Sequence, residues 1–229
     1  MGNLYIVSTP IGNLQDITIR AASILLSSKI IVTESTSKAG ILLEYLERVF
    51  GNRIENQKII SLTEDEEEYK IPEILSILSD NDIALISEAG TPLISDPGYK
   101  LTREAIKKSV TVVPIPGATA PIAALTASGL PTDKFTFVGY PPKKPGKRAE
   151  ILKKLSEAKQ VLSTTIILFE SPHRLLETLR DIQTAFGDTD IVVERELTKI
   201  HEEIRREKVS ESIKHFEESA PKGEFVILL

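Results

Sequence analysis

The stretch that decides the fold is residues 83–106, which read IALISEAGTPLISDPGYKLTREAI. Its first four residues form a short apolar run typical of a buried parallel strand, and residues 99–106 have the apolar spacing of an amphipathic helix. Residues 87–98 between them contain two glycines and several hydroxyl and carboxylate side chains. In open α/β sheets, ligands bind beyond the carboxyl ends of the strands, where glycine lets the backbone approach them closely. The pattern therefore predicts a ligand-binding loop at residues 87–98.

A purely structural role is the alternative for this loop. In that case Gly90 and Gly98 only shape a turn, and Asp96 only caps the helix that follows. The chain contains no G-x-G-x-x-G after its first strand and no G-x-x-x-x-G-K-[ST] anywhere. An ordinary dinucleotide or P-loop site is therefore disfavoured.

The composition is that of a folded protein with one large or two small α/β domains. Of the 229 residues, 41% are hydrophobic and 27% are charged, and none is cysteine, which excludes disulfides and thiolate chemistry. The histidines at 173, 201 and 215 lack the H-E-x-x-H spacing, so we expect no metal site. No apolar run approaches the roughly 20 residues that span a bilayer. We therefore expect a cytoplasmic protein with no membrane partner.

Strand candidates alternate with helix candidates along the chain. In the first half, strands are expected at 4–7, 29–32, 58–61, 83–86 and 111–113, with helices beginning near 19, 38, 69 and 99. This order predicts a βαβ series with parallel strands. In the second half we expect helices at 119–128 and from about 148, strands at 135–138, 165–169 and 191–193, and a mixed sheet completed by 202–209 and 224–229.

A proline-rich segment separates the two halves. Residues 114–117 read PIPG and interrupt both periodicities, because proline cannot serve a central strand and glycine allows a sharp change of direction. We therefore predict an N-terminal α/β domain at 1–114 and a C-terminal α/β domain at 115–229. If a cleft lies between them, the loop PGATA at 116–120 could face the same ligand as the Gly90 loop, although Thr119 could equally serve only as a helix cap.

Two segments at strand ends carry ionisable groups. In FESPHR at 169–174, Glu170 could be a general base or a ligand acceptor, and His173 with Arg174 could bind phosphate. The alternative is that Glu170 and Ser171 only cap the helix that follows. In ERELTKIHE at 194–202, Lys199 and His201 could contact phosphate or transfer protons, whereas a solvated charge network is the alternative.

A basic loop follows the strand expected at 135–138. It contains four cations within six residues, namely Lys143, Lys144, Lys147 and Arg148, in a chain of net charge −5. Such a run is often only a solvated loop, but local clusters of cations also bind nucleic-acid phosphates. We therefore consider it a candidate RNA contact.

The order of several motifs resembles that of one group of the tetrapyrrole methylase superfamily. The motifs are STPIGNL at 8–14, GTP at 90–92, PG at 116–117, ESPHR at 170–174, ELTK at 196–199 and KGEFV at 222–226. They span nearly the whole chain and are together highly specific. The group that they resemble methylates cytidine 2′-hydroxyls of small-subunit ribosomal RNA. The resemblance implies two α/β domains, usually in a homodimer, with S-adenosylmethionine bound in the cleft between the domains.

The resemblance also implies roles for matching positions. The cofactor would be lined by Gly90, Thr91, Pro92, Ile94, Ser95, Thr119, Ala120, Phe169, Glu170, Leu197 and Thr198. The ribosomal RNA or small ribosomal subunit would be contacted by Thr9, Pro10, Asn13, Lys143, Lys144, Lys147, Arg148, His173, Arg174 and Lys199. The candidates for catalysis, including acceptance of the hydroxyl proton, are Glu88, Glu170, Lys199 and His201.

Several positions depart from the group's usual pattern on the cleft side of the first domain. The usual acidic-Asp-Thr-Arg is replaced by a sequence with Ser35 and Ser37, the segment with Thr63 and Asp65 lacks the usual histidines, and Glu88 replaces an aspartate. Two alternatives therefore stay open. One is a small-molecule, tetrapyrrole-like methylase of the same fold, which the aromatic content of only 5% disfavours, and the other is a non-catalytic RNA-binding or ribosome-assembly protein.

Overall fold

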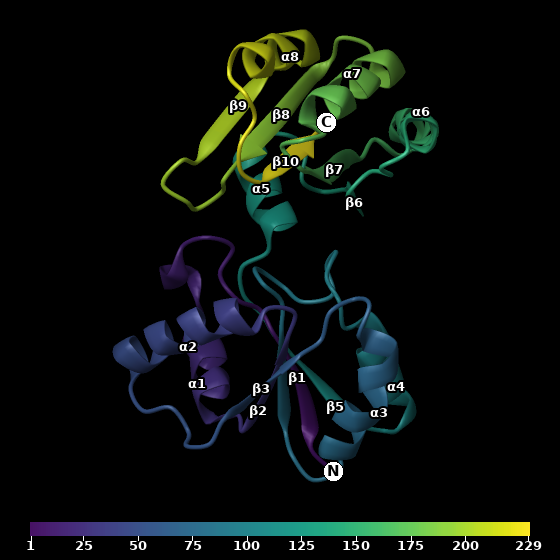
Figure 1. Cartoon of the computed structure of the whole chain (residues 1–229). Coiled ribbons are helices and arrows are strands. Elements are labelled where there is room, and N and C mark those ends of the chain that lie inside the picture. Colours follow the sequence, from purple (N-terminus) through teal and green to yellow (C-terminus); the bar gives the residue numbers. More distant parts are fainter. The chain divides into compact units, whose positions relative to one another are not determined.

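The computed structural model describes all 229 residues, which form two compact units, Met1–Thr119 and Ala120–Leu229 (Figure 1). Unit 1 contains β1 (Asn3–Val7), η1 (Leu14–Asp16), α1 (Ile19–Ser27), β2 (Ile30–Thr33), α2 (Thr36–Phe50), β3 (Lys58–Ser61), α3 (Glu67–Ile77), β4 (Ile83–Ile86), α4 (Tyr99–Lys107) and β5 (Thr111–Ile115). Unit 2 contains α5 (Ala120–Ser128), β6 (Phe135–Gly139), α6 (Pro145–Leu162), β7 (Thr165–Glu170), α7 (Leu175–Phe186), β8 (Asp190–Arg195), β9 (Glu203–Lys208), α8 (Val209–Glu218) and β10 (Phe225–Leu228). No helix combines the length and apolar character needed to cross a membrane.

Sheet 1, in unit 1, is parallel and has the strand order β3-β2-β4-β1-β5. Helices α1 and α2 pack on one face, and α3 and α4 pack on the other, as Figure 1 shows. Because both faces are covered, every residue of β2 and β4 is buried, which explains the unbroken apolar runs of these strands. The expected series of βαβ connections is confirmed.

Sheet 2, in unit 2, is mixed and has the strand order β6-β7-β10-β8-β9. Strand β10 runs antiparallel to β7 and β8, so β6, β7 and β8 all point the same way and end at one edge of the sheet. The face opposite α5 packs against α6, α7 and α8. The two C-terminal strands expected from the sequence are β9 and β10.

The expected domain boundary at residue 114 falls inside β5. This strand continues through Pro114 and Ile115, which pair with Ile6 and Val7 of β1. β5 is an edge strand, so the proline can lack an N–H on the side where no neighbour requires one. Proline therefore does not interrupt the strand, and unit 1 extends to Thr119.

A glutamate is buried on the face of sheet 2 that α5 covers. Glu194 of β8 lies between Val226 of β10 and Ile204 of β9, which belong to the apolar cluster under α5. Glu194 is 0% exposed, and neither of its carboxylate oxygens has a hydrogen-bond partner. Burial raises the pKa of Glu194 to about 7, although the charge of Arg206 opposes the rise. Glu194 is therefore neutral in the folded chain at mildly acidic pH.

The substitution Glu194→Gln tests this assignment. A glutamate of ordinary pKa, near 4.5, loses its proton earlier in the unfolded chain than in the folded chain, where the pKa is about 7. The free energy of unfolding is therefore not reduced by ionisation of Glu194 below about pH 4.5. It falls by up to about 3 kcal/mol as the pH rises from there through 7. Urea unfolding from pH 5 to 8 should show this loss in the wild type and a flatter profile in E194Q. Identical pH profiles of the two proteins would contradict it, and E150Q, at an exposed glutamate, serves as control.

Candidate functional site

The chain leaves the central strand of sheet 1, β4, and its neighbour β1 toward opposite faces. Strands β1 and β4 are neighbours, but α1 packs with α2 on one face, and α4 packs with α3 on the other. In open α/β sheets, such a reversal marks the crevice in which ligands bind, at the carboxyl ends of the strands. The loops at this point are residues 8–18 and 87–98, and the second is the predicted ligand loop.

Hydrogen bonds tie the loops of this edge together. The backbones of Thr9 and Gly90 exchange two hydrogen bonds, with N···O distances of 2.8 and 3.1 Å. The hydroxyls of Ser8 and Thr91 share a hydrogen bond of 2.9 Å, and the Thr91 hydroxyl donates to the carbonyl of Ala118 at 3.1 Å. The loops after β1, β4 and β5 therefore form one connected rim.

Residues in a left-handed backbone conformation gather in two of the predicted cofactor loops. Leu93 and Ser95 have φ angles of 73° and 66° in the loop after β4. Glu196 and Thr198 have φ angles of 51° and 65° in the loop after β8. Non-glycine residues adopt this conformation at a cost, and such residues cluster at functional sites. The strain supports both loops as candidates for ligand binding.

The alternative role of Asp96 as a helix cap is wrong. The N-cap of α4 is Gly98, in a left-handed conformation with φ 112°, and it has no side chain to cap the helix. A carboxylate from α3 takes this role, because Oε1 of Glu67 accepts the backbone N–H groups of Gly98, Lys100 and Leu101 at 3.2, 2.8 and 3.1 Å. Glu67 is a site residue that the sequence analysis missed.

Asp96 instead belongs to a group of carboxylates at the carboxyl edge of sheet 1. Burial raises the pKa of Asp96 to about 6, a hydrogen bond from Ser87 opposes the rise, and the charges of Glu34 and Glu88 add to it. The pKa of Glu34 is also raised, by burial and by the charge of Glu88. Glu88, a predicted catalytic residue, forms an ion pair with Lys38. Asp96 forms no ion pair, so it is better suited to accept a proton near neutral pH.

The serines that depart from the family pattern have local structural roles. Ser35 is the N-cap of α2 and accepts the N–H of Lys38 at 3.4 Å, and its hydroxyl lies 3.2 Å from that of Ser37. These residues therefore shape the start of α2, close to the carboxyl end of β2.

An aromatic cluster stands at the carboxyl edge of sheet 2. The ring of Phe169, at the end of β7, lies 4.9 Å from that of Phe137 and 5.5 Å from that of Tyr140, measured between centroids. Phe169 and Phe137 are half-buried, and Tyr140 is exposed. The cluster offers aromatic surface on which a flat heterocycle could stack.

Glu170 and Arg174 hold this edge together. The buried carboxylate of Glu170 accepts the N–H of Ser171 at 2.8 Å and the hydroxyl of Thr178 at 2.5 Å, and it pairs with Arg174 at 2.6 Å. Arg174 also donates to the carbonyl of Pro141 at 2.9 Å. No side chain caps the start of α7, so the helix-capping alternative is wrong, but these contacts give Glu170 and Arg174 a structural role in place of a general base and a phosphate contact.

Lys199 also forms ion pairs with neighbouring carboxylates. Its ammonium lies 2.8 Å from Glu196 and 2.9 Å from Glu224. Burial opposes its charge, but the hydrogen bonds to these two carboxylates outweigh burial and raise the pKa of Lys199. Lys199 therefore stays protonated and is not a proton acceptor. His201 lies exposed in the turn that follows.

The basic loop contains one cation that sequence analysis placed wrongly. Arg148 was expected in the exposed loop, but it lies within α6, and its side chain is only 3% exposed. Its guanidinium pairs with Asp181 at 2.6 Å and Glu177 at 3.2 Å, both from α7. The cations that are exposed are Lys143, Lys144 and Lys147. Arg148 therefore joins two helices and is not available to bind RNA.

The remaining predicted residues differ in accessibility. Thr9, Pro10, Gly90 and Pro92 are buried, Thr91, Thr119, Ala120, Leu197 and Thr198 are half-buried, and Asn13, Ile94, Ser95 and His173 are exposed. Asn13 caps η1 by accepting the N–H of Gln15 at 3.0 Å. The buried positions shape the rim, and the exposed ones can meet a ligand directly.

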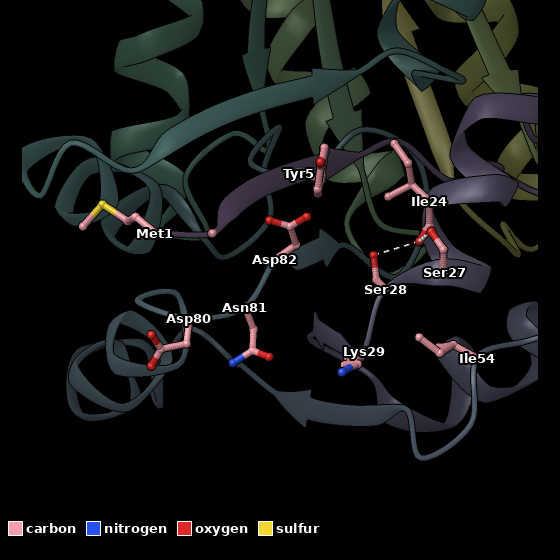
Figure 2. A pocket seen from close by; sticks show the side chains of 11 residues that line it. Met1, Tyr5, Ile24, Ser27, Ser28, Lys29, Ile54, Asp80, Asn81 and Asp82 are labelled. Atoms are coloured by element: carbon pink, nitrogen blue, oxygen red, sulfur yellow. Dashed lines mark hydrogen bonds between the residues drawn. The ribbon is translucent and has the colours of Figure 1, made fainter.

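A polar hollow of about 460 Å³ lies at the opposite, amino edge of sheet 1 (Figure 2). Its walls include Lys29, Asp80 and Asp82, which come from the segments that precede β2 and β4. The Asp82 carboxylate accepts the backbone N–H of Asn3 at 2.7 Å, so it fastens the start of β1. The hollow lies at the edge of sheet 1 opposite the connected rim. One of its polar groups, the Asp82 carboxylate, holds the start of β1.

Comparison with known proteins relates the chain to methylases. The family model described as Tetrapyrrole (Corrin/Porphyrin) Methylases matches residues 3–212. The "Ribosomal RNA small subunit methyltransferase I" of Thermotoga maritima is 42% identical over 231 residues, covering 100% of this chain and 98% of that protein. The protein of the same name from Synechocystis is 42% identical over 231 residues, covering 100% of this chain and 79% of that protein.

Two solved structures share the fold. A cobalt precorrin-4 methyltransferase is similar with a TM-score of 0.69 and 16% identity, over 99% of this chain and 94% of that chain. The uroporphyrin-III-C-methyltransferase of Thermus thermophilus is similar with a TM-score of 0.65 and 17% identity, over 100% of this chain and 94% of that chain. At this level of identity the likeness confirms the expected α/β fold class.

The substitution Gly98→Ala tests the geometry of the predicted ligand loop. A Cβ at this position would lie 2.8 Å from side-chain atoms of both Leu85 and Leu93, in a backbone conformation that alanine disfavours. We expect a loss of about 1–3 kcal/mol in unfolding free energy, measured by urea denaturation. Gly40→Ala is the control, because a Cβ there meets nothing within 4 Å inside α2, and a gain of about 0.5–1 kcal/mol is expected. Equal stability of G98A and wild type would refute the strained geometry.

Proposed function

This chain belongs to the tetrapyrrole methylase family, and we propose that it methylates the 2′-hydroxyl of a cytidine ribose in small-subunit ribosomal RNA, using S-adenosylmethionine. The observation that carries the proposal is the 42% identity, over the full length of this chain, to relatives named as small-subunit ribosomal RNA methyltransferases. The assignment to a cytidine 2′-hydroxyl rests on the resemblance carried by the motifs between residues 8 and 226.

Features of each unit fit S-adenosylmethionine. In unit 1, the connected rim contains exposed Ser95, whose hydroxyl and nearby backbone can form hydrogen bonds with a ligand, and half-buried Thr91, whose hydroxyl holds the rim together. In unit 2, the aromatic cluster around Phe169 fits a flat adenine. We propose that these residues, with Ala120 and Leu197, hold the cofactor. When bound, it supplies an electrophilic methyl group on a sulfonium.

Asp96 is the group that we propose as proton acceptor. With S-adenosylmethionine bound, its methyl group would pass from sulfur to the ribose oxygen, the sulfur would keep the electron pair of the broken bond, and the Asp96 carboxylate would accept the hydroxyl proton. A carboxyl with a pKa of about 6 is largely ionised at neutral pH and still attracts a proton more strongly than an ordinary aspartate. Two candidates inferred from the sequence are less suited to this role. Glu88 forms an ion pair with Lys38, and the buried carboxylate of Glu170 already has three partners.

Exposed cations of unit 2 supply the proposed contact with the RNA backbone. Lys143, Lys144 and Lys147 have exposed side chains before and at the start of α6. His173 is exposed beyond β7, and Arg174 connects that region to the carbonyl of Pro141. Such a surface attracts phosphates without reading sequence. The homodimer implied by the sequence resemblance stays a prediction.

Identification of the methylated nucleoside tests the proposed function. The purified protein is incubated with methyl-labelled S-adenosylmethionine and small ribosomal subunits that lack the modification, and the RNA is then digested. We expect the label in 2′-O-methylcytidine. Label in another nucleoside would keep ribosomal RNA methylation but reject the cytidine assignment. No label despite measured cofactor binding, beside an active control enzyme, would favour a small-molecule methylase or a non-catalytic RNA-binding protein.

The substitution Asp96→Asn tests the proton acceptor. We expect methyl transfer to fall by about 10²- to 10⁴-fold with little change in cofactor affinity, because the amide cannot take the proton. The wild-type rate should rise as the pH increases through about 6, because the base must be ionised. E88Q should lose less than about tenfold. The assignment is wrong if D96N keeps the wild-type rate, and Glu88 becomes the acceptor if E88Q is the inactive variant.

A further inference from the structure

We propose that Glu67 is a positioning residue that holds the loop 87–98 in the conformation that binds the cofactor, an inference that rests on the proposed function. Glu67 lies in the first turn of α3, far in sequence from the loop, and it is 4% exposed. Its carboxylate accepts three backbone N–H groups where the loop enters α4. The loop therefore ends on a side chain supplied by a different helix.

These three contacts meet a need that α4 cannot meet alone. The first N–H groups of any α-helix have no partner within the helix. Gly98, at the N-cap of α4, has no side chain to accept them, and its φ of 112° suits glycine and few other residues. The negative charge of Glu67 also interacts favourably with the positive end of the helix dipole. Glu67 thus fixes both the start of α4 and the direction from which the loop arrives.

The carboxylate of Glu67 depends on the loop in return. No lysine or arginine forms an ion pair with it, and its hydrogen-bond partners are the backbone N–H groups of Gly98, Lys100 and Leu101. Its sequence neighbours differ, because Glu66 pairs with Lys70 and Glu68 is exposed. A buried charge without these N–H groups would be strongly unfavourable. The buried position of Glu67 and the position of the loop therefore stabilise each other.

The strained residues of the loop have an anchor on each side. The front anchor is the pair of backbone hydrogen bonds between Gly90 and Thr9, and the rear anchor is Glu67. Leu93 and Ser95, between the anchors, keep left-handed conformations. Strained conformations persist only when the surrounding contacts enforce them. Loss of the rear anchor would let these residues relax and would move Ser95 and Asp96 away from the rim.

This arrangement predicts a specific kinetic signature. If removal of the Glu67 carboxylate leaves the loop in its binding conformation for only one-tenth to one-hundredth of the time, the apparent Kd for the cofactor rises about 10- to 100-fold. Saturating cofactor pulls the loop back, so kcat changes little. A purely structural role would lower stability and leave the Kd unchanged below the unfolding temperature.

The experiment compares Glu67→Ala and Glu67→Gln with two control variants. Glu68→Ala removes an exposed carboxylate from the same turn. Glu211→Ala removes a carboxylate that caps α8 in unit 2 by accepting the N–H of Lys208 at 2.9 Å. Calorimetry measures the Kd of S-adenosylmethionine and of its demethylated product, steady-state kinetics measure KM and kcat, and hydrogen–deuterium exchange measures the protection of residues 87–98.

We expect E67A to raise the Kd at least tenfold, to keep kcat within about threefold and to exchange faster at residues 87–98. E67Q should be intermediate, because its amide oxygen still accepts hydrogen bonds, and it tests the inference if E67A does not fold. E68A and E211A should keep the wild-type Kd. An unchanged Kd in E67A or, if E67A is unfolded, in E67Q overturns this inference but leaves the proposed function standing. Failure of the wild type to bind the cofactor overturns the proposed function and the inference with it.

Discussion

The parallel pairing of β1 with β4 is the constraint on which the functional arrangement depends. Because the chain leaves these neighbouring strands toward opposite faces of sheet 1, their loops diverge at the carboxyl edge and create a place for a ligand. The two hydrogen bonds between Thr9 and Gly90 keep the diverging loops in contact, and Glu67 fixes the far end of the second loop. The pairing of β1 with β4 therefore determines both the order of the strands and the edge at which the predicted ligand loop lies.

Most of the fold could be predicted because its signals are local. Strands such as β2 and β4 are buried on both faces, so their apolar runs are visible in a short window of sequence. The sequence does not show that Pro114 lies inside a strand. A proline is excluded from a central strand but tolerated in an edge strand, and only the order of the strands shows that β5 is an edge strand. The boundary between the units was therefore expected five residues too early.

The candidate site could be predicted where backbone conformation is encoded locally, as in the glycine loop after β4. It could not be predicted where a side chain finds a partner far along the chain. Arg148 reads as part of a basic loop, but its partners lie on α7. Glu67 reads as part of an acidic run, although its spacing to Ile71, Ile74 and Leu78 places it on the buried face of α3. That helical spacing was the available signal.

The strands at the margins of the two sheets also affect how the protein behaves at high concentration. An unpaired strand can recruit a strand from another molecule and start aggregation. At one margin of sheet 1, Pro114 deprives β5 of a backbone donor, and at one margin of sheet 2, β9 reads EIRREK and is densely charged. Proline and charge are the devices by which natural β-sheets discourage such recruitment. The proline that interrupts the sequence pattern thus helps to keep separate molecules from joining edge to edge.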